Sequence, residues 1–341
     1  DTVSVLRGAE SPVAGLATTL VQLPIRLGGL GMSCYRALQP VARVAALASS
    51  LGVLAERSGE EASEWLLPEH VEALRTVDED PASARQSTKA KEMWHEGRSG
   101  LFAEMENADK VRVLDHSSQV GSAWLHTIPL FPDLRLSDAT VSAALHVRTL
   151  HAGLGGQPIC DRCGDAHHVG HDDVCSYRKD AKTFRHDAIV RILADAYRDC
   201  PRKTGATTEP LVKNQLRADL LVVGPAAPQP PRSALDVSVV ALTGQDARKA
   251  IDKAFEGVQG EPDQSVVQAA LKVRYKEKLA KYEGSSPRVI PFILSAGGTL
   301  HATADSTLEA LKSCGKHRRL KAVKCRIGLA LIRYLGSVFR F

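Results

Sequence analysis

The chain has 341 residues, of which 44% are hydrophobic and 24% charged, a balance typical of globular protein with room for two or three domains. No apolar run reaches the roughly 18–20 residues that a membrane span needs. The opening, DTVSVLRGAE, has no signal-peptide pattern and is expected to continue a longer chain. Seven cysteines, an odd number, argue against a secreted disulfide framework and favour a reducing compartment.

The first 150 residues are expected to be helical. Residues 1–60 contain Ala- and Leu-rich segments interrupted by LPIRLGGLGM, where Pro24 and three following glycines predict a tight turn between helices. This turn is not a phosphate loop, because no strand precedes it and no Lys-Ser/Thr pair follows it. The pattern stays mostly helical to about residue 153, where GLGGQP predicts a hinge.

The pattern changes after residue 180. RHDAIVRILADAYRDC has helical spacing, and the runs at 216–223 and 234–241 are apolar or β-branched, which predicts strands. ARKAIDKAFEG and QSVVQAALKVRYKEKLAKY predict two more helices, and RVIPFILSAGG predicts a further strand. The expected fold class is therefore α+β: an all-helical N-terminal region, then a compact mixed α/β region over 185–300.

The stretch CDRCGDAHHVGHDDVC predicts a structural zinc site. A two-residue spacer lets the thiolates of Cys160 and Cys163 reach one tetrahedral ion, and His171 and Cys175 can supply the other two ligands. His167 or His168 can replace His171, because all three histidines are within reach. Zinc binding would order a segment that has too little apolar content to fold by itself.

Two strand carboxylates predict a second site. Asp219 and Asp236 lie on neighbouring predicted strands, where pairing can bring them together around a hard cation such as Mg²⁺. Such an ion can activate water for phosphodiester hydrolysis, with a lysine to stabilise developing charge. Helical spacing places Lys278 on the inward face of its helix and Lys281 about a quarter-turn away. The alternative is that these residues serve the fold alone.

The C-terminal segment is basic. Between residues 301 and 341, nine Lys/Arg stand against two acids, and apolar residues recur at helical spacing. Such a helix can bind nucleic acid or a membrane surface, or it can dock on the core with a solvated cationic end. The candidate nucleic-acid contacts are Lys316, Arg318, Arg319, Lys321 and Lys324.

Several segments, in their order along the chain, together resemble one family. LPIRLGGLGM, SAWLHTIP and LSDATVSAALHVRTL are similar to the post-palm stretch and connector of reverse transcriptases of non-LTR (LINE-type) retrotransposons. CDRC…H…C, RHDAI, RADLLVV…LDVSVV, KEKLAKY and VIPFILSAGG resemble the zinc knuckle and restriction-like endonuclease of their site-specific lineage. The resemblance covers nearly the whole chain and implies the PD-(D/E)xK fold group for the endonuclease part.

The resemblance implies five segments: a helical thumb-like segment at 1–60, a connector at 61–155, a zinc knuckle at 156–180, a restriction-like endonuclease domain at 181–300 and a basic C-terminal helix at 301–341. It implies catalytic roles for Asp219, Asp236, Lys278 or Lys281 and Tyr282. It implies a role in the active site or in DNA contact for the trio Arg185, His186 and Asp187. Ala218 stands where the family often has proline. Ser238 occupies the usual lysine position, so the lysine has to come from the helix.

The implied function is Mg²⁺-dependent nicking of target DNA, which leaves a 3′-hydroxyl that primes reverse transcription. No paired-aspartate palm motif precedes LPIRLGG, so polymerase activity is not expected of this fragment. The implied partners are target DNA and element RNA, with no membrane and no small-molecule substrate, and the implied location is the nucleus. The alternatives are a catalytically dead, nucleic-acid-binding retroelement remnant and, third, a membrane-peripheral protein.

Overall fold

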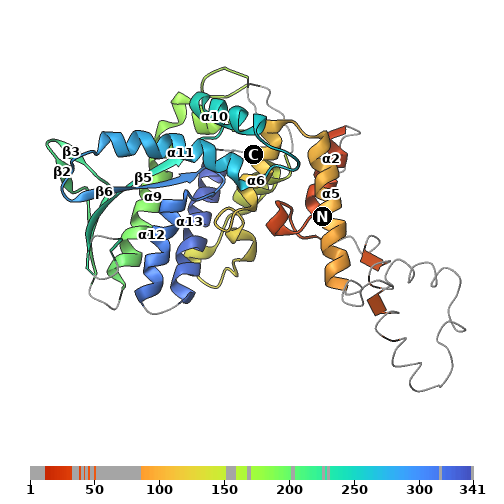
Figure 1. Ribbon diagram of the computed structural model, residues 1–341, viewed down its shortest axis with the longest axis horizontal. Coiled ribbons are helices and arrows are strands. Elements are labelled where there is room, and N and C mark those ends of the chain that lie inside the picture. The colour runs from red at the N-terminus through yellow and green to blue at the C-terminus, as the bar shows by residue number, and fades with distance from the viewer. Residues whose placement is uncertain are drawn as a thin grey trace, which may run out of the picture.

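The structure is a computed structural model (Figure 1). It describes residues 12–32, isolated positions between 38 and 50, and residues 86–150, 159–166, 170–200, 204–224, 227–228, 231–314 and 317–338. The predicted hinge at 153–158, the alternative ligands His167 and His168, and the candidate DNA contact Lys316 lie outside these ranges.

The described part of residues 12–150 contains helices and turns and no strand. Its helical order is α2 (Pro12–Gln22), η1 (Ile25–Leu27), α5 (Gln86–Glu104), α6 (Asn107–Ser117), η3 (Ala123–His126), η4 (Pro132–Leu134) and α7 (Asp138–Arg148). Ser137 caps α7, because its hydroxyl accepts a hydrogen bond from the Thr140 N–H at 3.2 Å.

The metal-ligand segment and the sheet follow. The later elements are α8 (His171–Val174), η6 (Ser176–Arg178), α9 (Lys179–Arg198), β1 (Gly205–Thr208), β2 (Leu211–Lys213), β3 (Leu216–Arg217), β4 (Leu220–Val223), β5 (Arg232–Val240), α10 (Gln245–Glu256), α11 (Gln264–Lys281), β6 (Arg288–Ser295), α12 (Ala302–Glu309), η7 (Ala310–Cys314) and α13 (His317–Val338). Together the elements make a mixed α/β protein, consistent with the predicted α+β class.

One sheet has the strand order β1-β4-β5-β6. The first three strands pair antiparallel, whereas β6 pairs parallel to β5 after the crossover through α10 and α11. The run at 216–223, predicted as one strand, is two. It breaks at Ala218 and Asp219, and β3 pairs with β2 in a separate hairpin.

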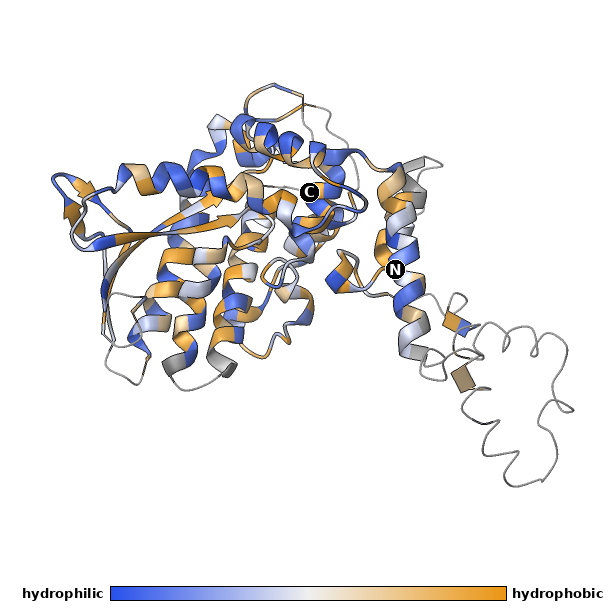
Figure 2. Ribbon diagram, in the orientation of Figure 1, coloured by the Kyte–Doolittle hydropathy of each residue, from blue (hydrophilic) through white to orange (hydrophobic). Residues whose placement is uncertain are grey.

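Side-chain alternation along β5 separates two packing faces. Leu235 and Val237 join the largest apolar cluster, together with buried residues of α9, α12 and α13. Ala234 packs on the other face with Tyr282, which ends α11. In Figure 1, α10 and α11 lie above the sheet and α9, α12 and α13 below it, and Figure 2 shows hydrophobic residues along the strands and the adjoining helices.

The N-terminal helices share apolar clusters with the α/β part. One cluster joins Leu20 and Phe102 to Ile251 of α10 and Val267 of α11. The carboxylate of Asp115 on α6 accepts hydrogen bonds from the backbone N–H groups of Gly297 at 3.0 Å and Thr299 at 3.1 Å. The predicted segment boundaries therefore cross a continuous core, and the five-segment division stays a prediction.

A buried arginine holds the glycine-rich turn. Gly28 has φ +97°, and a Cβ there would lie 2.4 Å from Cγ1 of Val113 on α6. Arg148 donates to the carbonyls of Gly29 at 2.9 Å, Ile25 at 3.0 Å and His116 at 2.6 Å. Burial lowers the pKa of Arg148 to about 10. The turn predicted from Pro24 and the glycines thus closes over a charged side chain that satisfies its carbonyls.

The C-terminal helix corrects two expectations. α13 lies among α9, α7 and η3, and its buried residues include Leu320, Ile327 and Tyr334. Its apolar stripe is therefore used by the core, which contradicts the membrane-peripheral alternative. Among the described residues, no helix is both long and apolar enough to cross a bilayer.

Lys324 is not a nucleic-acid contact, because its side chain is buried in the protein. The residue is 5% exposed, and its Nζ donates to Asp305 and to Gln119, both at 2.8 Å. Cations and apolar residues follow one another along this helix, so the sequence pattern did not distinguish a buried lysine from an exposed one. Lys321 is exposed, and the side chains of Arg318 and Arg319 lie outside the description.

We expect Arg148→Met to lower the free energy of unfolding by at least about 2 kcal/mol. The substitution keeps the apolar stem but removes the donor of the Gly29 and His116 carbonyls, at about 1–3 kcal/mol each, while the Ile25 carbonyl keeps the Gly28 N–H. Chemical denaturation measures this loss. Arg274→Met, on the exposed face of α11, is the matched control and should change stability by less than about 0.5 kcal/mol. Equal effects would contradict the assigned role of Arg148.

Candidate functional site

Two carboxylates lie close to the middle of β5. The register of β4 and β5 ends with Leu220 opposite Leu235. The backbone N–H of Asp219 donates to the Leu235 carbonyl at 3.0 Å, so the pairing is irregular at Asp219. The Asp219 carboxylate lies against the N–H of Val237, the residue after Asp236. Asp236 points toward α11, whereas Asp219 lies within reach of α9.

Asp236 is almost fully buried, at 4% exposed, and its two oxygens have different neighbours. Oδ1 accepts a hydrogen bond from the Tyr282 hydroxyl at 2.5 Å. Oδ2 lies 2.6 Å from Nζ of Lys278 but accepts no hydrogen bond of good geometry from any described residue. Burying a carboxylate is costly without a positive partner, and Lys278 provides one.

The two candidate lysines occupy different places. Lys278 lies in the last turn of α11 against Asp236, with its side chain 12% exposed. Lys281 is exposed, and its Nζ lies 4.7 Å from the centre of the Tyr282 ring. Burial and the neighbouring Asp236 raise the pKa of Tyr282, so its phenol stays protonated as a donor. The structure thus places Lys278 at the carboxylates and Lys281 at their edge.

Asp219 is held from two sides. Its Oδ2 accepts a hydrogen bond from the Val237 N–H at 2.6 Å and lies 3.3 Å from Nε2 of His186 on α9. The other ring nitrogen of His186 lies 3.0 Å from Asp187. The hydrogen bond to Asp219, opposed by burial and helped by Asp187, raises the pKa of His186 to about 9. At neutral pH His186 is therefore a cation that bridges two carboxylates.

Arg185 is separate from this group, contrary to its expected catalytic role. It is 3% exposed, its guanidinium lies 2.6 Å from Asp173, and it stacks on the Tyr334 ring at 4.0 Å. Successive helical side chains point about 100° apart, so Arg185 and His186 contact different neighbours. Arg185 joins α9 to the segment that carries the metal-ligand residues.

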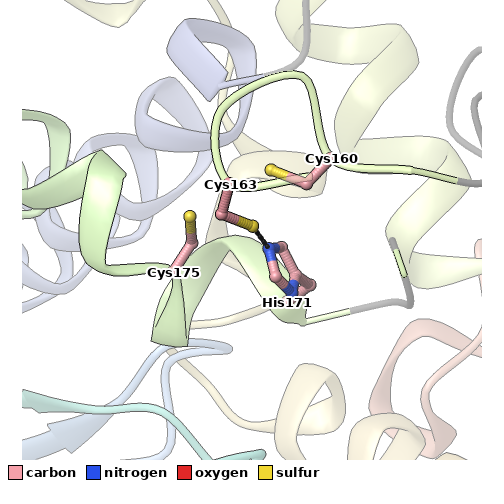
Figure 3. A group of neighbouring side chains, drawn as sticks. All are labelled: Cys160, Cys163, His171 and Cys175. Carbon is pink, nitrogen blue, oxygen red and sulfur yellow. Dashed lines mark hydrogen bonds between the residues drawn. The ribbon is translucent and has the colours of Figure 1, made fainter. Parts of the chain in front are cut away.

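Cys160, Cys163, His171 and Cys175 form a candidate metal centre (Figure 3). Their ligand atoms all lie within 4.8 Å of one another, and Cys163 Sγ is 3.2 Å from His171 Nε2. Among the described residues, they form the one such group of three or more His, Cys, Asp or Glu. Four ligands around one tetrahedral ion with metal–sulfur bonds of about 2.3 Å are separated by about 3.7 Å, so the spacing fits a metal.

Local backbone structure builds this centre. The Gly164 N–H donates to the Cys160 carbonyl at 3.0 Å, which closes the Cys-x2-Cys turn. Gly170 has φ +85° and starts α8, which places His171 and Cys175 one turn apart. A Cβ at Gly170 would lie 2.6 Å from Cγ2 of Thr243, so the turn needs glycine for space as well as for conformation.

Arginines dock the metal-ligand segment on the helices. The Arg178 guanidinium lies 2.6 Å from Asp172 and 2.7 Å from Asp161, and it donates to the Val338 carbonyl at 3.2 Å. The Tyr334 hydroxyl donates to the Asp172 carbonyl at 2.9 Å. The segment is therefore part of the packed structure between α9 and α13. Sequence reasoning missed Arg178, because an arginine in a polar stretch gives no sign of burial.

One cysteine outside the candidate metal centre, Cys200, is disulfide-bonded. The expectation of a reducing compartment, drawn from the odd number and clustering of the cysteines, did not foresee this bond.

No protein-family model matches this chain, and no curated protein matches it. The likeness to non-LTR retrotransposon proteins therefore rests on the motifs and their order.

We expect the His186 ring to titrate with a pKa near 9 in the metal-free protein, measured by NMR. Asp219→Asn should lower this pKa more than Asp187→Asn, because the hydrogen bond to Asp219 is its largest cause. Since the folded-state pKa exceeds the ordinary 6.5, the stability that His186 contributes is fully present below about pH 6.5 and is lost as pH rises through about 9. An unshifted ring pKa would contradict the bridge.

Proposed function

We propose that this chain is the DNA-binding, metal-dependent endonuclease portion of a non-LTR retrotransposon polyprotein, and that it nicks target DNA to prime reverse transcription. The observation that carries the proposal is that the Asp219 carboxylate lies against the N–H of Val237, next to Asp236, with Lys278 against Asp236. The order helix, three antiparallel strands, two helices and a parallel strand supports a restriction-like domain of the PD-(D/E)xK group.

The residues at the carboxylates fit a hard divalent cation. Carboxylate oxygens are the ligands that Mg²⁺ prefers, and buried Asp236 Oδ2 has the Lys278 ammonium 2.6 Å away but no hydrogen bond of good geometry from any described residue. Asp219 and Asp236 would hold the ion, which supplies charge stabilisation and lowers the pKa of bound water. Lys278 places a positive charge where the phosphate becomes more negative, and Tyr282 orients Asp236.

Zinc is the metal proposed for the four-residue centre. Three thiolates and one imidazole form a closed tetrahedral set of the kind that structural zinc sites use. The role is structural, because all four ligand positions are filled by protein. His171 is the histidine that lies with the three cysteines, which favours it over His168.

The proposed partners are target DNA and the element's RNA, and a nuclear location follows from such a substrate. Lys321 remains an exposed cation on α13, close in sequence to Arg318, Arg319 and Lys316. Cations at such a helix start contact phosphates without reading sequence. Lys324 is withdrawn from this set.

A second candidate is a catalytically dead, nucleic-acid-binding remnant. It is favoured by the interactions that the carboxylates already make within the protein. Asp219 accepts a hydrogen bond from Val237 and pairs with His186, and Asp236 accepts a hydrogen bond from Tyr282 and pairs with Lys278. On this reading the four side chains stabilise the fold. Salt-dependent DNA binding without Mg²⁺-dependent nicking would favour the remnant.

We expect the wild-type protein to nick supercoiled plasmid in Mg²⁺. Asp219→Ala should reduce the nicking rate by at least about 100-fold, because it removes a ligand of the cation. Lys278→Ala should cause a comparable loss, whereas Lys281→Ala, its exposed neighbour, should stay within about threefold. Circular dichroism checks that each variant is folded. Equal nicking by wild type and folded Asp219→Ala would exclude Asp219 from the mechanism.

We expect one zinc per purified chain by elemental analysis. Cys163→Ser should abolish zinc retention, and Cys325→Ser, a free cysteine outside the centre, should retain it. Chelation should lower the melting temperature of the wild type, because the ion links two turns that pack on α9 and α13. A wild-type protein without zinc whose melting temperature ignores chelator would refute the site.

A further inference from the structure

The β2–β3 hairpin, residues 209–217, leaves the sheet directly before Asp219. β1 ends at Thr208 and β4 begins at Leu220, and the chain between them turns back on itself as a separate two-stranded ribbon. In Figure 1 this ribbon forms one end of the molecule, beyond the main sheet. Its tip, Asn214 and Gln215, is exposed.

The base of the hairpin is fixed to the carboxylate site. The pairing shifts between Leu211 and Lys213, so Val212 is an extra residue that turns inward. Val212 is buried with Tyr282, and its carbonyl accepts a hydrogen bond from the Ser286 N–H at 2.9 Å. The Tyr282 hydroxyl, which donates to Asp236, also lies 3.0 Å from the Arg217 carbonyl. The ribbon is therefore held rigidly relative to Asp236.

The hairpin also contains unusual backbone conformations. Among the described residues, three non-glycine positions have positive φ, and two of them are Glu209 at +50° and Asn214 at +47°. Such conformations cost free energy and tend to persist at functional positions. Here they turn the ribbon out of the sheet and form its tip.

We propose that the β2–β3 hairpin enters a groove of the target duplex and reads base pairs beside the nick, an inference that rests on the proposed nuclease function. A two-stranded ribbon fits the major groove, and the amides of Asn and Gln pair with adenine edges. At about 3.3 Å per residue, Asn214 lies about 16 Å along the chain from Asp219, which equals about five base pairs.

The charges around the hairpin suit a duplex. Exposed Arg217 lies at its base, and exposed Arg288 lies two residues after Ser286, whose N–H donates to Val212. Two acids near the base, Glu209 and Glu283, are also exposed. The Arg217 guanidinium donates to the Glu209 carbonyl at 3.0 Å, which leaves its remaining N–H groups for a phosphate. Lys213 is not counted among the phosphate contacts, because its Nζ donates to the Glu283 carbonyl. The amides at the tip thus read bases while the cations at the base bind the backbone.

The test maps nick positions over a plasmid population that carries random sequence inserts. The Asn214→Ala/Gln215→Ala double variant should nick more slowly at the preferred sequence and at an unchanged rate at other sequences. Its base preference about five base pairs from the nick should fall by at least about 5- to 150-fold, the range for losing one bidentate base contact. Gln245→Ala, which removes an exposed amide at the start of α10, is the matched control and should keep the wild-type preference.

A second measurement uses binding to the preferred duplex in an Asp236→Asn background, which removes the need for catalysis. Arg217→Ala should lower affinity for all sequences alike and reduce the slope of log affinity against log salt by about 1.

If the double variant keeps the wild-type nick preference, the hairpin does not read DNA. A hairpin that binds a second protein chain instead would give that result, together with a concentration-dependent change in oligomeric state. If the wild type does not nick at all, the proposed function fails first, and unchanged binding by both hairpin variants would then also overturn the inference.

Discussion

The buried carboxylate of Asp236 is the constraint on which the rest of the α/β part depends. A charge out of contact with water needs a fixed counter-charge and fixed donors, and Lys278 and Tyr282 supply both from the end of α11. α11 must therefore end over the middle of β5, which requires the crossover through α10 and α11 and the parallel pairing of β6. Tyr282 also fixes the base of the hairpin. One buried carboxylate thus helps to fix the positions of a helix, two strands and a projecting ribbon.

A second constraint acts from the opposite side, through α9. This helix carries His186 toward Asp219 and, one residue earlier, Arg185 toward Asp173 and Tyr334. The candidate metal centre is thereby joined to the carboxylates by two neighbouring residues of a rigid helix. Arg178 adds a bond to the last carbonyl of α13 that the structure describes. The candidate metal centre and the carboxylate site are therefore held in one frame, although they would bind different ions.

Local patterns predicted much of this arrangement, and long-range burial limited the rest. Cys160, Cys163, His171 and Cys175 are close in sequence, so their spacing alone indicated that they bind one metal ion. The predicted strands brought Asp219 close to Asp236, and helical spacing separated Lys278 from Lys281. The turn of Asp219 toward α9 follows from irregular pairing, which the sequence does not predict. Lys324 misled because an apolar stripe with cations looks the same on a surface helix and on a central one. The hairpin was missed because 216–223 is a continuous run, and only the tertiary fold bends it at Asp219.

The central position of α13 has a consequence for how the fold would fail. α7, α9 and the candidate metal centre all pack against this helix, although they lie much earlier in the chain. A truncation just upstream of residue 317 would remove the helix, and several buried surfaces would be left facing water. A chain that keeps every proposed active-site residue could therefore still fail to fold.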